Sequence, residues 1–555
     1  MFHFMEPLRN RTRRILCLAK AFGGDQLDET HSVVVDDAGN VYAVGNFSST
    51  VDFDPGNGVY ELTSNGSYDV FILKLDVNGN FVWAKAAGGT NTDFAAAVTL
   101  DAAGNVHVTG SYYATIDIDP GDGVSTITSE GYEDGFILKL DNDGNFIWGK
   151  SFGGTDQKDI GKSIAVDDDG NVYTTGSFWW IADFDPGPQD YIISPGNAYA
   201  MFILKLDVNG DFIWAKSMDG SGVSNIDSGH GIALDATGNV YTVGTFTGTA
   251  DFDTGSGTLN LSSTTPTYSD VYISKLDTDG NFLWAKSFGS AFWDYGYAIA
   301  LDDDGNIYTT GGRGGVGDFD PGVDVFNLEG AGLFISKLDN DGNFIWAKSM
   351  GGSTYAISTS LALDNLANVY ITGTYSGTPD FDPGVDVFNM TSSDQDAHFC
   401  KLDTDGNFIW AKTIGGSSAD NGYDVFVDND NTIYVVGRFK TTVDFDPDAP
   451  VYNLSTAFNY PEAYVMKYGP MESAVQESTP TTTSLSVYPS PAHDQLTINK
   501  RNDQSISAFV VTNNLGQEVL SGKCTSKSMT IDISSLPGGF YFVRAGDEVV
   551  KFEKE

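Results

Sequence analysis

A pair of aspartates separated by one residue recurs seven times along the chain, and these are the first residues whose spacing could support chemistry. Four of the seven copies read D-F-D-P-G. In an extended strand the two carboxylates project to one side, about 6.5–7 Å apart, while the middle residue points to the other side. Such a pair could flank Ca²⁺, which takes roughly six to eight oxygen ligands. The calcium hypothesis concerns Asp52, Asp54, Asp117, Asp119, Asp183, Asp185, Asp251, Asp253, Asp318, Asp320, Asp380, Asp382, Asp444 and Asp446.

The same segment also has the composition of a β-turn, which is the simpler interpretation. In the first copy Asp54 can cap the turn, Pro55 fixes its own φ, and Gly56 permits a left-handed conformation. The departures within the series, Thr254 and Asp448, fit either interpretation. Calcium is therefore the only cofactor that the sequence suggests, and the turn is its alternative.

Four aromatic residues lie outside the repeated pattern: Trp179, Trp180, Phe292 and Trp293. Exposed aromatic rings commonly stack on sugars or on partner proteins, so these four are a second hypothetical binding site. Packing at the rim of the fold is the alternative.

Catalytic motifs are poorly represented. The six histidines form no H-x-x-H or H-E-x-x-H motif, and no G-x-S-x-G, phosphate-binding loop or Cys–His arrangement is present. Paired carboxylates are so frequent that none stands out for glycoside hydrolysis. The sequence predicts no catalytic residue, and a protein that is not an enzyme is the simpler expectation.

The elements that would position these residues follow from a repeat. Phe136–Gly154 reads FILKLDNDGNFIWGKSFGG, and close copies recur along most of the chain. Their tryptophans are Trp83, Trp148, Trp214, Trp284, Trp346 and Trp410, which gives steps of 65, 66, 70, 62 and 64 residues. A repeat of this regularity indicates an array of one structural unit.

Each unit contains four short apolar runs that predict β-strands. In the third unit they are Ser163–Asp167, Val172–Phe178, Phe202–Asp207 and Phe212–Ser217. They are rich in β-branched and aromatic residues, and D-x-x-G turns join them in pairs. The D-x-D segment, the aspartate of the first hairpin and the lysine of the third strand, which stands in K-L-D in six units and in K-Y-G in the seventh, each occur seven times. We therefore predict an all-β fold, a seven-bladed β-propeller.

The two ends of the array predict how the ring closes. The seventh unit stops at Val465–Gly469 without a fourth strand, and a lone half-repeat stands at Ile15–Gly24. We expect this N-terminal strand to complete the seventh blade, so that no long sheet edge is left open. The propeller then covers residues 14–469, after a basic tail over 1–13. The D-x-D segments and the loops after G-G would share one face, where binding is expected.

Composition limits the partners. The net charge is −45, which excludes nucleic acid as a natural ligand, because a polyanion is bound through Lys and Arg. The acidity is typical of a soluble secreted protein. No apolar run reaches the roughly 20 residues that span a bilayer, so no transmembrane segment is expected. Cys17, Cys400 and Cys524 fall in separate regions and predict no disulfide framework, and we expect a monomer.

The repeat resembles the SBBP-type bacterial β-propeller repeat. The shared pattern is I-A-V-D-x-x-G-N-V-Y-x-x-G-x-F followed by F-I-x-K-L-D-x-x-G-N-F-x-W-A-K-x-x-G-G, and the resemblance covers about residues 15–469. Two turns depart from it, at Asn365–Asn368 and at Asp428–Thr432. The resemblance implies a propeller fold and a secreted bacterial setting, without an established activity.

The composition changes after Gly469. Residues 470–483 (PMESAVQESTPTTT) are polar and predict a linker, and residues 484–555 form a small domain with 8 Asp or Glu against 7 Lys or Arg. Its predicted strands are Leu485–Tyr488, Gln495–Asn499, Ala508–Thr512, Glu518–Ser521, Met529–Ile533 and Phe540–Ala545. Their spacing indicates a compact β-sandwich.

This last domain resembles the C-terminal sorting domain of proteins exported by the bacterial type IX secretion system. The matching motifs are VYPSPA, NLGQEV and IDISSLPGGFYF, with the basic close at Lys551 and Lys554. The resemblance implies export across the outer membrane of a Gram-negative bacterium, recognition by the sorting machinery, and surface attachment or release. Its motif residues are Tyr488, Pro489, Pro491, Leu515, Gly516, Leu536, Pro537, Gly539 and Tyr541.

Such cargo also needs an inner-membrane signal peptide. Arg9, Arg11, Arg13 and Arg14 precede an apolar stretch, but Lys20 interrupts it too early. A usable signal peptide is not visible, and a misplaced start codon or an upstream beginning of the gene is the expected explanation.

The sequence thus predicts a secreted or cell-surface propeller that acts as a binding or adhesion module, with a glycan or a surface protein as its ligand. One alternative is a carbohydrate-active lyase or hydrolase with its site in the central funnel. The other is a structural surface protein without a soluble ligand. A cluster of blade-specific His, Arg, Tyr or Glu at the central channel would favour the enzyme, whereas an aromatic, acidic rim without one would favour binding.

Overall fold

The computed structural model describes residues 14–155, 158–195, 199–220, 227–352, 355–448 and 451–470, and much of 485–554. The predicted N-terminal tail, 1–13, and the linker except Pro470 lie outside the described residues. The chain divides into two compact units, Met1–Met471 and Glu472–Glu555, which are considered separately.

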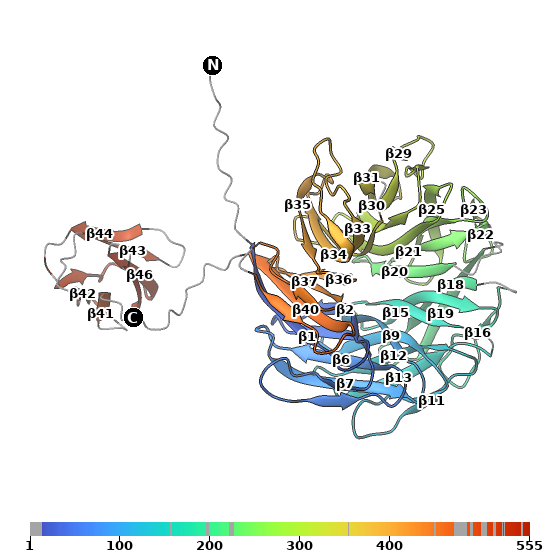
Figure 1. Cartoon of the computed structure of the whole chain (residues 1–555), viewed down its shortest axis with the longest axis horizontal. Helices are drawn as coiled ribbons and strands as arrows, with labels where there is room; N and C mark the ends of the chain where they lie inside the picture. The colour runs from blue at the N-terminus through green and yellow to red at the C-terminus, as the bar shows by residue number, and fades with distance from the viewer. Residues whose placement is uncertain are drawn as a thin grey trace, which may run out of the picture. The chain divides into compact units, whose positions relative to one another are not determined.

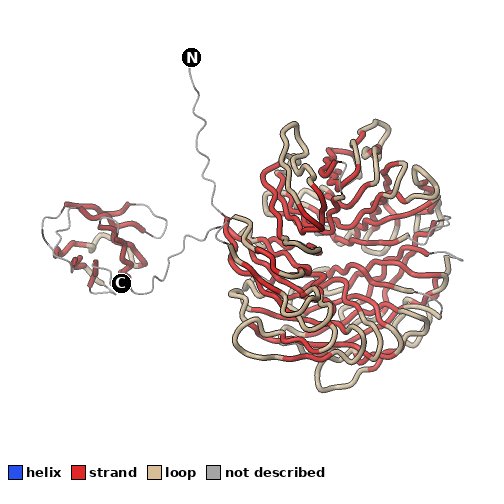
Figure 2. Tube along the Cα trace, in the orientation of Figure 1, coloured by secondary structure: helices blue, strands red, loops and turns tan. Residues whose placement is uncertain are grey.

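The first unit is built from antiparallel strands joined by turns, and no helix occurs among the described residues (Figure 2). The predicted all-β class is confirmed. Each of the first six repeats supplies four longer strands that pair in chain order, and the first repeat has β2 (Glu29–Val35), β3 (Val41–Phe47), β6 (Asp69–Leu75) and β7 (Phe81–Gly89). Among the described residues, no helix is long and apolar enough to cross a membrane.

The next five repeats follow the same plan. Their strands are β8 (Phe94–Leu100), β9 (Val106–Tyr112), β12 (Asp134–Leu140) and β13 (Phe146–Phe152); β14 (Ile160–Val166), β15 (Val172–Trp179), β18 (Tyr199–Leu206) and β19 (Phe212–Gly220); β20 (Ser228–Leu234), β21 (Val240–Thr247), β24 (Ser269–Leu276) and β25 (Phe282–Ser290); β26 (Asp294–Leu301), β27 (Ile307–Arg313), β30 (Ala331–Leu338) and β31 (Phe344–Gly352); and β32 (Ala356–Leu363), β33 (Val369–Gly377), β34 (Ser392–Leu402) and β35 (Phe408–Ile414).

The last sheet combines the two ends of this unit. It has the order β36 (Asn421–Val427), β37 (Ile433–Phe439), β40 (Glu462–Pro470) and β1 (Arg14–Phe22). Strand β1 runs antiparallel to β40, from Arg14 opposite Pro470 to Phe22 opposite Ala463, and the two strands lie side by side in Figure 1. The first strands β2 and β36 also pack together, as do the first strands of all other successive repeats.

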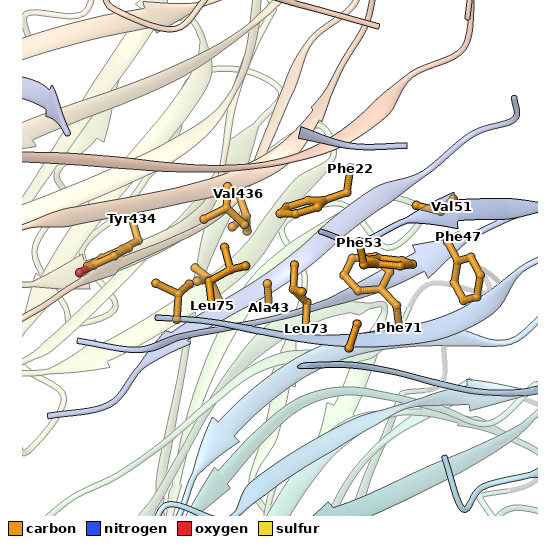
Figure 3. Packing of buried hydrophobic residues seen from close by; sticks show 14 of the residues in the cluster. Phe22, Ala43, Phe47, Val51, Phe53, Phe71, Leu73, Leu75, Tyr434 and Val436 are labelled. Carbon is orange, nitrogen blue, oxygen red and sulfur yellow. The ribbon is translucent and has the colours of Figure 1, made fainter. Parts of the chain in front are cut away.

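Hydrophobic packing joins the first and last sheets. Phe22 of β1 is buried in one cluster with Phe53, Phe71 and Leu73 of the first repeat and with Val436 of β37 (Figure 3). Burial of large apolar side chains is the main stabilising contribution to folding, at about 25 cal/mol per Å². The N-terminal strand therefore contributes to the core as well as to the sheet.

The repeated tryptophans join neighbouring sheets, as their regular spacing suggests. The indole Nε1 of Trp83 donates a hydrogen bond to the carbonyl of Asn142, in the last turn of the next repeat, at 3.2 Å. Trp148, Trp214, Trp284 and Trp346 make the equivalent bond one repeat further on. These residues are structural.

A short hairpin that the sequence did not predict interrupts the connection between the second and third strands. In the first repeat it consists of β4 (Thr50–Asp52) and β5 (Glu61–Thr63). Its counterparts are β10 (Thr115–Asp117) with β11 (Thr126–Thr128), β16 (Ala182–Asp183) with β17 (Ile192–Ile193), β22 (Thr249–Asp251) with β23 (Asn260–Ser262), β28 (Gly317–Asp318) with β29 (Asn327–Leu328), and β38 (Thr442–Asp444) with β39 (Asn453–Ser455). Several of these hairpins add to the outer strand of the preceding repeat, as β10 does to β7.

The second unit contains two sheets over one apolar core. One sheet has the order β41 (Leu485–Tyr488), β42 (Gln495–Lys500) and β45 (Ser528–Asp532); the other has β44 (Glu518–Lys523), β43 (Ala508–Asn513), β46 (Gly539–Ala545) and β47 (Glu548–Lys554). Six of these strands match the predicted runs. The sequence analysis missed β47, because its charged residues obscured the alternation that places Phe552 in the core.

Candidate functional site

The first strand of every repeat contains a β-bulge at the same position. In β2 the pairing register shifts between Thr30 and Ser32, so His31 has no partner on β3. A bulge of this kind re-aims a side chain and is common next to functional sites. The seven bulged residues are His31, Ala96, Lys162, His230, Tyr297, Thr359 and Tyr423.

A glycine in the second strand makes room for each bulge. A Cβ built on Gly45 would lie 1.9 Å from the carbonyl oxygen of Glu29, and one built on Gly110 would lie 1.8 Å from that of Phe94. The equivalent glycines of the other repeats show the same crowding at 1.8–2.0 Å. The glycine of the V-Y-x-x-G-x-F motif is thus required by the close approach of the bulged strand.

The bulged position varies in chemical type more widely than the positions around it. The preceding residue is Thr, Ala, Ser or Gly in every repeat, and the second residue after the bulge is a buried Val, Ile or Leu. The bulged residue itself is His, Ala, Lys, His, Tyr, Thr or Tyr. The framework is therefore repeated, whereas the side chain that it presents differs among the repeats.

All seven bulged residues except Ala96 and Thr359 are large polar or aromatic groups, and all seven line one space. This cavity of about 250 Å³, called the central channel below, is lined by residues from the first strand of every repeat. A second cavity of about 360 Å³, called the lysine pocket, shares Lys162, His230 and Tyr297 with the channel. It extends to Lys158, Tyr199 and Tyr295. Ligand sites are commonly cavities of about 300–1,000 Å³.

The histidine shared by the two cavities has a defined tautomer. His230 Nδ1 lies 2.8 Å from the carbonyl oxygen of Gly296, so Nδ1 carries the proton that is donated to it. Burial, followed by the charge of Lys162, holds the pKa of His230 well below its ordinary value. The imidazole is therefore neutral, and its Nε2 is a hydrogen-bond acceptor or a base.

Aromatic rings are stacked beside this histidine. The His230 and Tyr297 ring centroids are 5.3 Å apart with planes 22° apart, and Tyr295 stacks on Tyr297 at 5.8 Å. Burial raises the pKa of Tyr297. The tyrosine hydroxyl therefore stays protonated at neutral pH and can donate a hydrogen bond.

The opposite side of the channel carries an ion-pair network. Arg438 Nη1 pairs with Glu29 Oε1, and the Tyr423 hydroxyl donates to the same oxygen at 3.3 Å. His31 lies 3.4 Å from the other oxygen of Glu29 and stacks on Tyr423 with ring centroids 5.4 Å apart. These charges largely neutralise one another.

Asp424 follows Tyr423 in the channel wall but is turned to structural bonds. It accepts hydrogen bonds from the hydroxyls of Ser32 and Ser360, at 2.9 and 2.6 Å, and from the amide of Val33 at 2.9 Å. Burial raises the pKa of Asp424. The residue joins the first, sixth and seventh repeats.

The D-x-D aspartates hold the short hairpins together. Asp52 Oδ1 accepts bonds from the amides of Asp54 and Tyr60, at 3.0 and 2.8 Å, and Asp54 Oδ1 accepts from Gly56 at 2.8 Å. The other six copies make the same three kinds of bond. Phe53 between them is buried, as the alternation predicts. These bonds favour the turn interpretation over calcium.

The structure does not bring the seven pairs together, because each lies in its own hairpin. Across the described ranges, no three His, Cys, Asp or Glu side chains come together as a metal-binding group. Calcium at the D-x-D segments remains a hypothesis.

The four off-pattern aromatic residues form two pairs of chain neighbours in different repeats. Trp180 is 43% exposed, and Trp179 packs edge-on against Tyr199, with ring centroids 4.6 Å apart. Phe292 and Trp293 both contact Tyr268. Through Tyr199, Trp179 borders the lysine pocket. Trp180 follows β15, and Phe292 and Trp293 lie in the loop before β26.

A further cavity, about 420 Å³ in volume, lies between turns of the fifth and sixth repeats and is lined mainly by their aspartates and asparagines. Asp302 and Asp364 are engaged there in bonds to Asn306 and Asn368 within their own turns. This cavity is a gap between structural turns.

The sorting-motif residues have mainly structural contacts where the structure describes them. Tyr541 is buried and donates from its hydroxyl to the carbonyl of Pro537 at 2.8 Å, while Leu536 packs against the core of the small unit. Gly539 begins β46, and Tyr488 is 50% exposed at the end of β41. Pro489, Pro491, Leu515 and Gly516 lie outside the described residues.

The sequence analysis missed the residues of the channel and the pocket. It treated the six histidines as scattered, and it began the first strand of the third repeat at Ser163, one residue after the bulged Lys162. The repeated glycine of the second strand was the available indication, because a glycine inside a strand often marks a bulge.

Comparison with known proteins identifies two parts of the chain. Residues 486–554 match the family described as the secretion system C-terminal sorting domain. The chain carries a type IX sorting domain. Residues 147–177 match the β-propeller repeat family, SBBP, so both resemblances found in the sequence are confirmed.

More distant similarities add no functional information. The chain is 26% identical over 515 residues to the uncharacterized WD repeat-containing protein L264 of Acanthamoeba polyphaga mimivirus, an alignment that covers 78% of this chain and 37% of that protein. The chain thus spans little more than a third of the length of this curated relative.

Among solved structures, the chain is similar to the WD40 β-propeller domain of Doa1, with 12% identity, 83% and 98% of the two chains covered, and a TM-score of 0.37. It is also similar to PorZ, a surface component of the type IX secretion system of Porphyromonas gingivalis, with 10% identity, 97% and 100% covered, and a TM-score of 0.23. Neither likeness is close enough to support a conclusion.

Proposed function

We propose that this chain is an exported surface module of a Gram-negative bacterium that binds a ligand at the central channel. The sorting domain supports export to the cell surface or secretion. The strand pairing supports a ring of seven blades, closed where β1 joins β40. In such a ring the first strands face the axis.

One observation carries the proposed site: the same bulge in seven strands presents side chains of five different types, on a framework that otherwise repeats. Residues that only stabilise the fold are repeated from one unit to the next here, as the tryptophans and turn aspartates are. A position that is fixed in geometry and variable in chemistry fits a role in recognition.

Tyr297→Ala tests the site with little risk to the fold, because Ala96 already occupies the equivalent position in the second repeat. The fluorescently labelled full chain would be applied to an array of glycans, together with Tyr297→Ala and with Trp180→Ala as the rim control. We expect the wild type and the rim variant to bind the same glycans and Tyr297→Ala to lose them.

The opposite pattern, with loss only in Trp180→Ala, would place binding on the rim. A parallel assay would test whether the chain retains a surface protein and whether Tyr297→Ala abolishes that retention. If neither a glycan nor a surface protein binds in this way, a structural surface protein without a soluble ligand becomes the better interpretation.

The same residues favour a second candidate, a carbohydrate-active enzyme. Blade-specific His and Tyr do cluster at the channel, which is the feature expected of an enzyme. His230 has an unprotonated Nε2 and stacks on the ring of Tyr297, and an imidazole and a phenol can each exchange a proton with a substrate. Incubating bound glycans with the full chain tests this: shorter products in the wild type, absent with His230→Ala, would establish turnover.

A further inference from the structure

The wall of the lysine pocket has more cationic than acidic side chains, whereas the protein as a whole is acidic. Among the described residues that line it, Lys158 and Lys162 are cationic, His230 is neutral, and Asp227 is acidic. The Asp227 carboxylate is 2% exposed and accepts bonds from the amide and the hydroxyl of Thr247, at 2.9 and 2.8 Å. In a chain with a net charge of −45, a pocket that presents ammonium groups is unusual.

The two lysines differ in what surrounds them. Lys158 is paired with Glu133 at 2.9 Å and lies 3.1 Å from the Tyr113 hydroxyl. Lys162 has no carboxylate oxygen within 4.0 Å among the residues that the structure describes. Burial alone lowers its pKa to about 8, so the ammonium is still mainly charged at neutral pH. A half-buried, unpaired charge is stabilised by a bound counter-charge.

The remaining wall suits a ring-shaped, hydroxyl-rich molecule. Tyr295, Tyr297 and His230 form one run of stacked rings, and Tyr199 lies in the same pocket. Aromatic faces pack against the apolar faces of sugar rings, while tyrosine hydroxyls and the His230 Nε2 can bond sugar hydroxyls. The cavity of about 360 Å³ borders the channel, with which it shares lining residues.

We infer that the lysine pocket binds an acidic saccharide, whose carboxylate or sulfate pairs with the Lys162 ammonium while a sugar ring lies against the tyrosines. This inference rests on the proposed function and names the ligand class of its site. On the opposite side, next to His31 and Tyr423, Arg438 is already paired with Glu29, and the described residues of the channel wall there include no comparable unpaired cation.

Isothermal titration of the full chain tests the inference with four probes: a galacturonate oligosaccharide, a sulfated galactose oligosaccharide, the neutral galactose oligosaccharide of equal length, and an oligoglutamate peptide. Two variants change the pocket: Lys162→Met, which removes the charge but keeps an apolar side chain, and Tyr297→Ala. Lys286→Met is the matched control, because Lys286 lies outside both cavities. We expect one acidic saccharide to bind, about tenfold or more weakly in Lys162→Met, as for a lost bond to a charged group. Lys286→Met should bind like the wild type, and added salt should weaken binding.

Which of the two acidic probes binds more tightly identifies the anion. Equal binding of the neutral saccharide, lost in Tyr297→Ala but unchanged in Lys162→Met, would overturn the inference and leave the proposed site standing. If the acidic saccharide binds equally well to the wild type, to Lys162→Met and to Tyr297→Ala, both the inference and the proposed site would be overturned. No binding of either acidic saccharide, or equal binding of oligoglutamate, would overturn the inference alone.

Discussion

Buried aspartates before the first strands should make the propeller less stable as the pH rises. Asp93 is fully buried and accepts bonds from the amides of Gly89 and Tyr113, at 2.8 and 3.2 Å. Burial outweighs these bonds and raises its pKa from 3.8 to about 7, with a further contribution from Asp69. The equivalent carboxyls behave alike: Asp28, Asp159, Asp294 and Asp420, with pKa values of about 7, 8, 6 and 7.

The sign of the effect follows from linkage. Because Asp93 holds its proton more firmly in the folded protein, its contribution to stability is complete below pH 3.8 and is lost as the pH rises through about 7. From about pH 5 to about pH 8 this corresponds to at most about 2.7 kcal/mol of unfolding free energy, at about 1.36 kcal/mol per pH unit below the folded pKa. The turn aspartates affect stability at more acidic pH. For Asp36, burial opposes ionisation, but hydrogen bonds from Asn40 outweigh the burial and hold the pKa below its ordinary value.

Asp93→Asn isolates this contribution. The asparagine keeps one acceptor but turns an NH₂ group toward an amide, which destabilises the fold by about 1–3 kcal/mol at any pH. At about pH 8 the variant also avoids a buried negative charge, so its destabilisation should be smaller there than at about pH 5, by up to about 2.7 kcal/mol.

Urea unfolding followed by tryptophan fluorescence measures the difference, since all nine tryptophans precede residue 469 and report only the larger unit. Exposed Asp122→Asn is the matched control and should leave the pH dependence unchanged. Equal destabilisation by Asp93→Asn at both pH values, or a larger one at about pH 8, would refute the reasoning.

Three further predictions concern the framework. Gly110→Ala should destabilise the larger unit by about 1–3 kcal/mol or more in the same urea assay, because the new Cβ would lie 1.8 Å from the Phe94 carbonyl oxygen. The control Gly255→Ala should change the stability little, because its Cβ would meet only Asp253, at 3.1 Å. Equal effects of the two substitutions would contradict the account of the bulge. Deleting residues 1–24 removes β1 and should strongly reduce the yield of soluble, monodisperse protein, whereas deleting residues 1–13 should not. Similar melting temperatures and similar light scattering for the two deletion variants would argue against ring closure. Melting in Ca²⁺ and then in EDTA should give one temperature, since the D-x-D carboxylates already accept backbone bonds; a rise with Ca²⁺ would support calcium at these segments.

Much of the fold follows from the sequence because it is repeated. Strand identity, turn positions and the half-repeat at Ile15–Gly24 can all be recognised by comparing copies, and the structure pairs this half-repeat with β40. The short hairpins were missed because the D-F-D-P-G segment reads as a turn, and the strands on either side of it are only two or three residues long, as in β4 and β5.

The channel residues could not be predicted in the same way, for a physical reason. A bulge breaks the period-two alternation by one residue, so Lys162 falls where the alternation gives no indication of a strand. The bulged residues also differ between repeats, so they form no motif that a comparison of the copies could detect. His31 and Tyr423 are 392 residues apart in sequence and stack only because the first and seventh repeats are adjacent.

The central claim, that the bulged residues form a ligand site, is tested most directly by crystals of the full chain grown with the tightest-binding acidic saccharide. The account predicts new density in the lysine pocket, with an anionic group next to Lys162 Nζ and a sugar ring against Tyr297. Density confined to the loops around Trp180 or Trp293, with the channel unchanged, would contradict it.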